Sequence, residues 1–286
     1  MHSCGHDAHT AILLSVAEFL KENEDKLGVM VRLIFQPSEE GAESGGKMLT
    51  ENGAVDGVEE VIASHCDMSL PTGELGVCIG DCMAACVPLT VRCFGKTSHA
   101  TRPEKGIDAI AMALRFFEKA STAVGEEANG DKYIWSLGRI TGGTAHNVIS
   151  DKCEMEISFR FFNVDFGERV ENRVYEILAD VEKEFGGKIQ LDWKMSTGAL
   201  INDKDVAEKI IGVANKAGLA IKIIPSRMSS EDFGWYLTKA RGALFRFGTF
   251  NADNDCVAAA HCNDFKIDEP AMKSAINLFC EYALNG

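Results

Sequence analysis

The sequence predicts an α/β protein with a mostly parallel-sheet domain and an inserted α+β domain of the ferredoxin-like kind. Short apolar strands alternate with helices over the first 66 residues, which is typical of a mostly parallel sheet. Between residues 87 and 193 the order becomes β-α-β-β-α-β, the split pattern of ferredoxin-like units. The earlier alternation resumes from residue 205. We therefore expect one domain made of residues 1–83 and 197–286, interrupted by a second domain at residues 84–196.

Hydrophobic spacing predicts the elements of the interrupted domain. Apolar residues recur at helical spacing over residues 10–23, and Gly28 ends that helix. Short apolar runs predict strands at 29–35 and 60–66, with a helix at 41–52 between them. In the last third of the chain the same reasoning predicts strands at 220–224 and 243–247 and helices at 205–216, 231–239 and 270–284.

The middle of the chain has its own set of elements. Strands are predicted at 87–94, 133–140, 153–162 and 188–193, and helices at 107–124 and 166–185. Two consecutive domains are an alternative interpretation of this pattern. Insertion is favoured because His261, near the end of the chain, repeats the chemistry of the first segment.

Composition excludes several classes of protein. The 286 residues are 46% hydrophobic and 25% charged, as in a globular protein, and no apolar run is long enough to span a membrane. The net charge of −14 argues against a nucleic-acid surface. No secretion signal is recognisable, and the ten cysteines follow no regular spacing, so we interpret them as reduced thiols of a cytoplasmic protein. An anionic substrate would need a locally positive site, which metal ions supply.

Potential metal ligands open the chain and recur at separate places along it. Cys4 and His6 are two residues apart, and a thiolate with an imidazole suits a borderline-soft divalent metal, zinc above all. Downstream, a carboxylate pair and two isolated histidines follow apolar runs, at Glu39, Glu40, His65 and His261. Sites in parallel sheets form beyond the carboxyl ends of the strands, which is where several of these residues are predicted to lie. Taken alone, a histidine on an apolar strand is more often part of the core.

Five motifs resemble those of one enzyme superfamily. Residues 1–10, Met-His-Ser-Cys-Gly-His-Asp-Ala-His-Thr, and residues 35–41, Phe-Gln-Pro-Ser-Glu-Glu-Gly, are similar to motifs of the metal-dependent amidohydrolases of the aminoacylase and carboxypeptidase G superfamily. The most similar branch contains hippurate hydrolases, auxin-conjugate amidohydrolases and N-acetyldiaminopimelate deacetylases. Residues 95–100, 142–149 and 230–233 also match, and all five motifs occur in the family's order.

The resemblance implies a site with two divalent metal ions per chain, zinc or manganese, with cobalt or nickel as alternatives. The residues implied as metal ligands are Cys4, His6, Glu40, His65 and His261. Two ions that share a water lower its pKa, and a bridging thiolate would neutralise charge between them. Glu39 is the expected general base, because on a strand it would face away from Glu40 and remain available for proton transfer.

Three residues of the inserted domain are expected to contact substrate. The resemblance implies that His99 steadies the substrate or its developing oxyanion, and we expect Asn147 to donate to a carbonyl or carboxylate. Arg160 suits a substrate carboxylate, although a structural ion pair explains it nearly as well. Asp7 and His9 are candidates to orient the ligands. The acids of residues 230–232 are interpreted first as helix caps and second as pocket-lining groups.

The activity implied is hydrolysis of the amide of a small-molecule N-acyl amino acid, N-acetyl or similar. A dipeptidase or aminopeptidase on the same scaffold is the alternative among enzymes. Family members carry a substantial segment before the Cys-Gly-His motif, so we also expect an incomplete sheet, reduced stability, and, as a further alternative, an inactive ligand-binding dimeric remnant. The inserted domain is expected to act as a lid and to form a homodimer.

Overall fold

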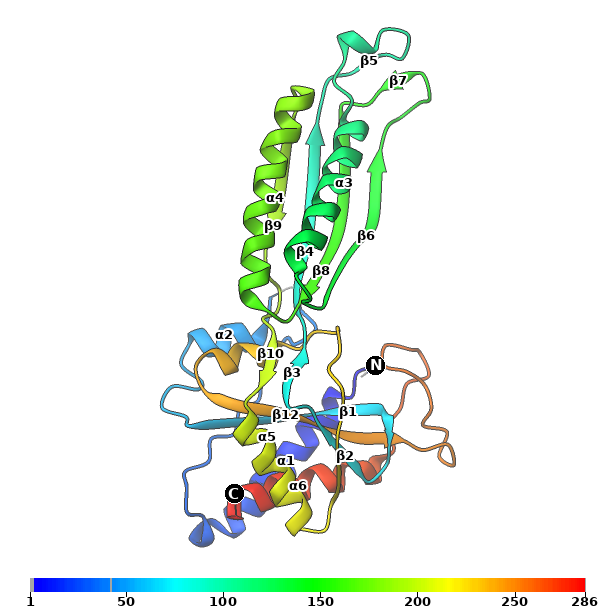
Figure 1. Ribbon diagram of the computed structural model, residues 1–286. Helices are drawn as coiled ribbons and strands as arrows, with labels where there is room; N and C mark the ends of the chain where they lie inside the picture. The colour runs from blue at the N-terminus through cyan, green and yellow to red at the C-terminus, as the bar shows by residue number, and fades with distance from the viewer. Residues whose placement is uncertain (1–2, 42, 286) are drawn as a thin grey trace. The chain divides into compact units, whose positions relative to one another are not determined.

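The computed structural model describes residues 3–41 and 43–285, and they form two compact units (Figure 1). The first unit contains the chain up to Cys82, Leu200–Arg227, and the chain from Asp232 onwards. The second unit contains Met83–Ala199 and the short segment Met228–Glu231. In the part of the chain that the structure describes, no helix is both long and apolar enough to cross a membrane.

A four-stranded sheet is the centre of the first unit. Its order is β1 (Glu60–Pro71), β12 (Arg241–Phe250), β2 (Glu74–Val77) and β11 (Ala220–Ile223). The pairs β1–β12 and β2–β11 are parallel, whereas β12 and β2 are antiparallel. The helices α1 (His6–Glu22), α5 (Lys204–Lys216) and α6 (Met272–Asn285) lie on one face of this sheet (Figure 1). Their apolar stripes bury a core with the strands that includes Ile12, Val77, Phe245, Phe247 and Leu278.

Shorter elements complete the first unit. The helix α2 (Gly45–Glu51) begins at Ser44, whose side chain accepts a hydrogen bond from the backbone N–H of Lys47. A two-stranded ladder joins β3 (Gly80–Met83) to β10 (Leu200–Asn202). The 3₁₀ helices are η1 (Glu24–Lys26), η3 (Asp232–Thr238) and η4 (Glu269–Ala271).

The second unit is a ferredoxin-like sheet covered on one face by two helices. Its order is β6 (Tyr133–Gly142), β8 (Lys152–Phe161), β4 (Ala85–Phe94) and β9 (Lys188–Trp193), and every pair is antiparallel. The helices α3 (Ala109–Ala128) and α4 (Val164–Phe185) begin at Asp108 and Asn163, whose side chains accept backbone N–H groups of the first turn. Beyond one end lie β5 (Ser98–His99), β7 (Val148–Ile149) and η2 (Pro103–Lys105). The predicted fold class is therefore confirmed.

The predicted strand at 29–35 is wrong. These residues pair with no strand in the described part of the chain, and the side chain of Met30 is 96% exposed. The apolar run has the composition of a strand, but a strand forms only where a neighbour accepts its backbone hydrogen bonds. Arg32 instead donates to the carbonyl oxygens of Ala54 and Asp56. The helix predicted at 231–239 is the 3₁₀ helix η3, and β2, β3 and β10 are not among the predicted strands.

Candidate metal centre

The first ligand motif lies at the start of α1 and is shaped by a glycine. Gly5 has a φ of 78°, in the left-handed region, and it separates Cys4 from His6. A Cβ atom at this position would lie 2.8 Å from Sγ of Cys66 on β1. Only glycine therefore lets the chain turn here while lying directly against the strand that carries His65.

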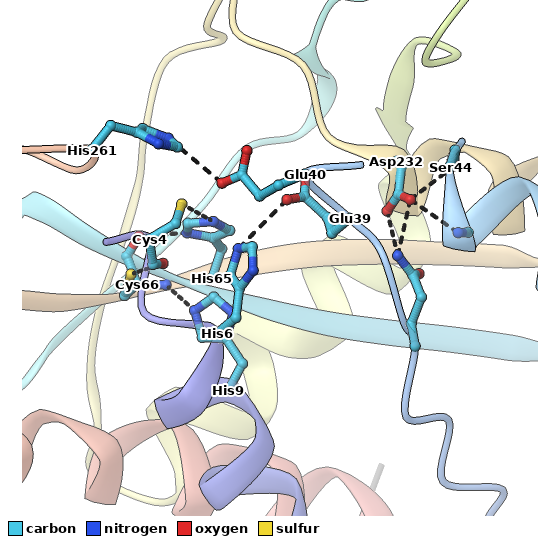
Figure 2. A network of polar contacts seen from close by, with 12 residues as sticks. Cys4, His6, His9, Glu39, Glu40, Ser44, His65, Cys66, Asp232 and His261 are labelled. Atoms are coloured by element: carbon cyan, nitrogen blue, oxygen red, sulfur yellow. Dashed lines mark hydrogen bonds and ion pairs between the residues drawn. The ribbon is translucent and has the colours of Figure 1, made fainter. Parts of the chain in front are cut away.

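His65 lies on β1 and is held by its own strand. Its Nδ1 lies 2.8 Å from the carbonyl oxygen of Cys66, so this nitrogen carries the ring proton when it donates to that oxygen. Nε2 faces Cys4 at an Nε2–Sγ distance of 3.6 Å (Figure 2). Burial, followed by the positive charge of Arg246, lowers the pKa of His65 to about 4, which keeps the imidazole neutral and able to bind a metal.

The predicted ligands converge in the first unit. His6 Nε2 lies 3.5 Å from Glu39 Oε2, and His261 Nε2 lies 3.6 Å from Glu40 Oε1. Their donor atoms form several clusters, and two of these share Cys4: one with His6 and His65, the other with Glu40 and His261. Figure 2 shows these side chains pointing toward one another from α1, β1 and two loops. The structure thus brings together all five residues predicted as ligands, with Glu39 beside them.

The spacing of these donors fits metal ions. Two nitrogen, oxygen or sulfur ligands of one tetrahedral zinc are about 3.3 to 3.6 Å apart at ordinary zinc–ligand distances. The two contacts that join predicted ligands, Cys4–His65 and Glu40–His261, are both 3.6 Å and lie at about that separation. Cys4 is the residue that these two clusters share.

The thiol of Cys4 needs a cation beside it to ionise. Burial, and then the negative charge of Glu40, raises the pKa of Cys4 to about 12. A divalent cation between these groups reverses both effects, because it attracts the thiolate and compensates the carboxylates. The local charge is therefore complementary to bound metal.

Glu39 and Glu40 lie in a loop, and this differs from the expected strand end. Ser38 has a left-handed φ of 57°, and its Oγ donates to the carbonyl oxygen of Glu43, which closes the loop on itself. The two carboxylates still diverge, Glu39 toward His6 and Glu40 toward His261 (Figure 2). An oxygen of each glutamate nevertheless lies within 4.8 Å of the other, so the expectation that strand alternation makes Glu39 face away from Glu40 is wrong.

Asp232 contacts this region, and the preferred interpretation of residues 230–232 as caps of their own helix does not account for it. Its carboxylate lies against the loop of residues 36–46, which carries Glu39 and Glu40 and is called the glutamate loop below. The carboxylate accepts hydrogen bonds from Gln36 Nε2, Ser44 Oγ and the Gly46 N–H at 2.8 to 2.9 Å. These partners are 186 to 196 positions away along the chain, so no local pattern could have indicated them. Ser230 accepts a hydrogen bond from Arg160.

The predicted substrate contacts lie in the second unit. His99 on β5 pairs with Val148 on β7, and the neighbouring Ala100 N–H donates to the carbonyl oxygen of Asn147, so His99 and Asn147 are close together. Nδ1 of His99 accepts from the Thr101 N–H, which leaves the proton of a neutral ring on Nε2.

Arg160 lies at the other end of this sheet. Lys152, at the start of β8, lies soon after the β7 residues that pair with Ser98 and His99. Arg160 is eight residues further along β8, or about 26 Å in an extended strand. Nη1 donates to the Met228 carbonyl and to Ser230 Oγ, and Nε donates to Ser158 Oγ. The second unit therefore does not bring Arg160 together with His99 and Asn147.

Comparison with known proteins agrees with the resemblance seen in the motifs. The family model described as peptidase family M20/M25/M40 matches residues 1–285. The chain is 34% identical over 284 residues to N-acetyl-L-cysteine deacetylase of Bacillus subtilis (strain 168), covering 99% of this chain and 67% of that protein. It is 29% identical to N-acetyldiaminopimelate deacetylase of Streptococcus uberis, covering 96% of this chain and 73% of the relative.

A solved structure is also similar over nearly the whole chain. A dinuclear metal-binding peptidase of the M20 family from Bacillus subtilis superposes with a TM-score of 0.81 at 28% identity, covering 99% of this chain and 72% of that one. The family match, the relatives and the shared fold confirm the resemblance inferred from the motifs. The chain belongs to peptidase family M20/M25/M40 and is a hydrolase of that family.

Proposed function

We propose that this hydrolase cleaves the amide bond of N-acyl amino acids, with an N-acetyl or similarly small acyl group, and uses two divalent metal ions. The observation that carries the proposal is the pair of ligand clusters that share Cys4, with the carboxylate of Glu39 directly beside them. The names of the two deacetylases described above support the substrate class. Zinc is the first choice because of the thiolate, and manganese, cobalt and nickel are the alternatives.

The proposed roles follow from the chemistry of each side chain. Cys4, His6, Glu40, His65 and His261 would hold the ions, which supply a water of lowered pKa and polarise the amide carbonyl. Glu39 accepts a proton from the attacking water and delivers it to the leaving amine nitrogen. His99 donates from Nε2 to the developing oxyanion, and the amide of Asn147 donates to the substrate. For Arg160 we propose binding of a substrate carboxylate, with the guanidinium positioned by its hydrogen bonds to Ser158, Met228 and Ser230.

We further propose that residues 84–196 act as a lid and that the protein forms a homodimer through this region. The outer strands of its sheet, β6 and β9, have backbone groups that pair with no further strand of that sheet, so they can pair with a second copy. Sedimentation equilibrium at micromolar concentration tests the proposed homodimer, and a monomer would refute it. We place the enzyme in the cytoplasm, where its ten thiols remain reduced.

The decisive experiment separates binding of metal from proton transfer. Protein loaded with zinc or manganese is assayed on N-acetyl amino acids and on dipeptides, with metal content measured on the same samples. We expect Glu39→Gln to lower kcat by about 10²- to 10⁴-fold while both ions stay bound. Glu43→Gln, an exposed residue of the same loop, is the matched control and should leave turnover and metal content unchanged.

Two results would contradict the proposal. Unchanged turnover in Glu39→Gln would exclude Glu39 as the base. Wild-type protein that holds two ions and cleaves dipeptides but no N-acetyl amino acid would replace the proposed substrate class by peptides.

A further inference from the structure

We infer that Asp232 is a positioning residue that fixes the loop carrying Glu39 and Glu40. This inference rests on the proposed function, because it assigns a task to Asp232 through those two carboxylates. Asp232 itself touches no predicted metal ligand in the described hydrogen bonds. Its carboxylate instead binds both ends of the loop, at Gln36 before the glutamates and at Ser44 and Gly46 after them. Figure 2 shows Asp232 beside Ser44.

Asp232 is buried, and its contacts are short. The residue is 1% exposed. Oδ1 accepts from Gln36 Nε2 at 2.8 Å, and Oδ2 accepts from the same nitrogen at 2.9 Å, from Ser44 Oγ at 2.8 Å and from the Gly46 N–H at 2.9 Å. A buried carboxylate is costly unless its oxygens are satisfied, and these donors satisfy them. Loss of the acceptor would remove this partner from the buried Gly46 N–H and from the half-buried Gln36 and Ser44.

Two glycines allow this close packing. A Cβ atom at Gly46 would lie 2.6 Å from the carbonyl oxygen of Asp232, and one at Gly45 would lie 1.7 Å from that of Pro37. The Gly45 N–H also donates to the carbonyl oxygen of Ser38 at 3.2 Å. The start and end of the loop are thus clamped to each other and to Asp232, so the directions of the two glutamates depend on this clamp.

The position requires a group that only accepts hydrogen bonds. Tyr236 donates its hydroxyl proton to Gln36 Oε1, which fixes the orientation of the Gln36 amide and directs Nε2 toward Asp232. In the variant Asp232→Asn, the new amide would turn its N–H₂ group either toward that Nε2 or toward Ser44 and the Gly46 N–H. In either orientation, the N–H₂ group of the new amide faces another hydrogen-bond donor. A carboxylate at position 36 would remove the conflict, because it could accept both from the new amide and from the Tyr236 hydroxyl.

The test compares Asp232→Asn with the double variant Asp232→Asn/Gln36→Glu in the full chain. Asp268→Asn is the matched control, because Asp268 is also buried and accepts hydrogen bonds from Asn251 and Asn254 away from the glutamate loop. Hydrogen exchange of peptides spanning residues 36–46 is measured on metal-free protein, zinc affinity by titration calorimetry, and kcat and KM on an N-acetyl amino acid.

We expect Asp232→Asn to raise exchange of the 36–46 peptides, to weaken zinc binding about tenfold, and to lower kcat by about 10- to 100-fold with a smaller change in KM. The double variant should restore all three properties to within about threefold of wild type. Asp268→Asn should lower the melting temperature without moving exchange in 36–46 or zinc affinity.

One result would overturn the inference: Asp232→Asn lowers the melting temperature but behaves like Asp268→Asn in hydrogen exchange of residues 36–46 and in zinc affinity. Asp232 would then contribute only to general stability. Failure of the double variant to recover any of the three properties also overturns the inference. If wild-type protein cleaves no N-acyl amino acid, the proposed function fails by itself. Exchange and zinc affinity would still decide the role of Asp232.

Discussion

Nε2 of His9 accepts a hydrogen bond from the backbone N–H of Cys66 at 3.0 Å, and this bond joins the first turns of α1 to β1 beside His65. Burial, followed by the charges of His65 and His6, lowers the pKa of His9 well below its usual value. The imidazole therefore stays neutral, with its acceptor nitrogen available to Cys66. His9 is expected to orient the ligands, and its hydrogen bond goes to β1, the strand that carries His65.

Replacing His9 by phenylalanine should weaken metal binding. The variant His9→Phe keeps a ring of similar shape but leaves the Cys66 N–H without its acceptor, so α1 and β1 can shift relative to each other. We expect a loss of about 10- to 100-fold in zinc affinity by calorimetry. His146→Phe, at an exposed histidine of the second unit, is the control. Equal zinc affinity in wild type and His9→Phe would contradict the role assigned to this bond.

The variant Gly5→Ala should impair both folding and metal binding. Alanine in the left-handed region costs about 1–2 kcal/mol, and its Cβ would also collide with Sγ of Cys66. Gly57→Ala is a matched control, because Gly57 has a φ of 72° but no atom within 4 Å of the added carbon. Both variants should lose stability in urea unfolding, and only Gly5→Ala should lose zinc affinity. A similar zinc affinity in the two variants would show that the spacing of Cys4 and His6 tolerates the shift.

The carboxylate of Glu60 should make folding stability depend on pH. Burial raises its pKa, but hydrogen bonds from Lys209, Tyr282 and Arg241 outweigh burial and lower the pKa below its ordinary value. The stabilisation is therefore complete above the pKa of an unfolded glutamate, and it is lost as pH falls through the lower pKa of the folded state. Lys209 Nζ and Tyr282 Oη both donate to Oε2.

We expect Glu60→Gln to lower the free energy of unfolding by about 1–2 kcal/mol at pH 7. The difference from wild type should shrink as the pH falls through the lowered pKa of the folded-state carboxyl, because the wild-type carboxyl is then protonated as well. Urea titrations at several pH values measure it, with the exposed neighbour Glu59→Gln as the control. A difference that stays constant over this range would mean that the charge of Glu60 contributes nothing.

The local patterns predicted most of the fold, and the family motifs indicated the residues that converge around Cys4. Local patterns failed where distant contacts decide. The helices and the ferredoxin-like order have amphipathic periods that can be recognised without knowledge of neighbours. Residues 29–35 have the composition of a strand, but pairing depends on another part of a sheet, and no described strand lies beside them. Asp232 resembles a helix cap by its neighbours in sequence, whereas its true partners lie in a loop near the start of the chain.

The parallel pairing of β1 with β12 joins two strands that are synthesised far apart in time. Glu60 lies opposite Arg241, so the strand that pairs with the one carrying His65 leaves the ribosome roughly 180 residues after His65 itself. His261 follows later still. If the proposed ions bind as inferred, a nascent chain that already displays Cys4 and His6 would lack both β12 and His261. Metal capture would then come late in biosynthesis.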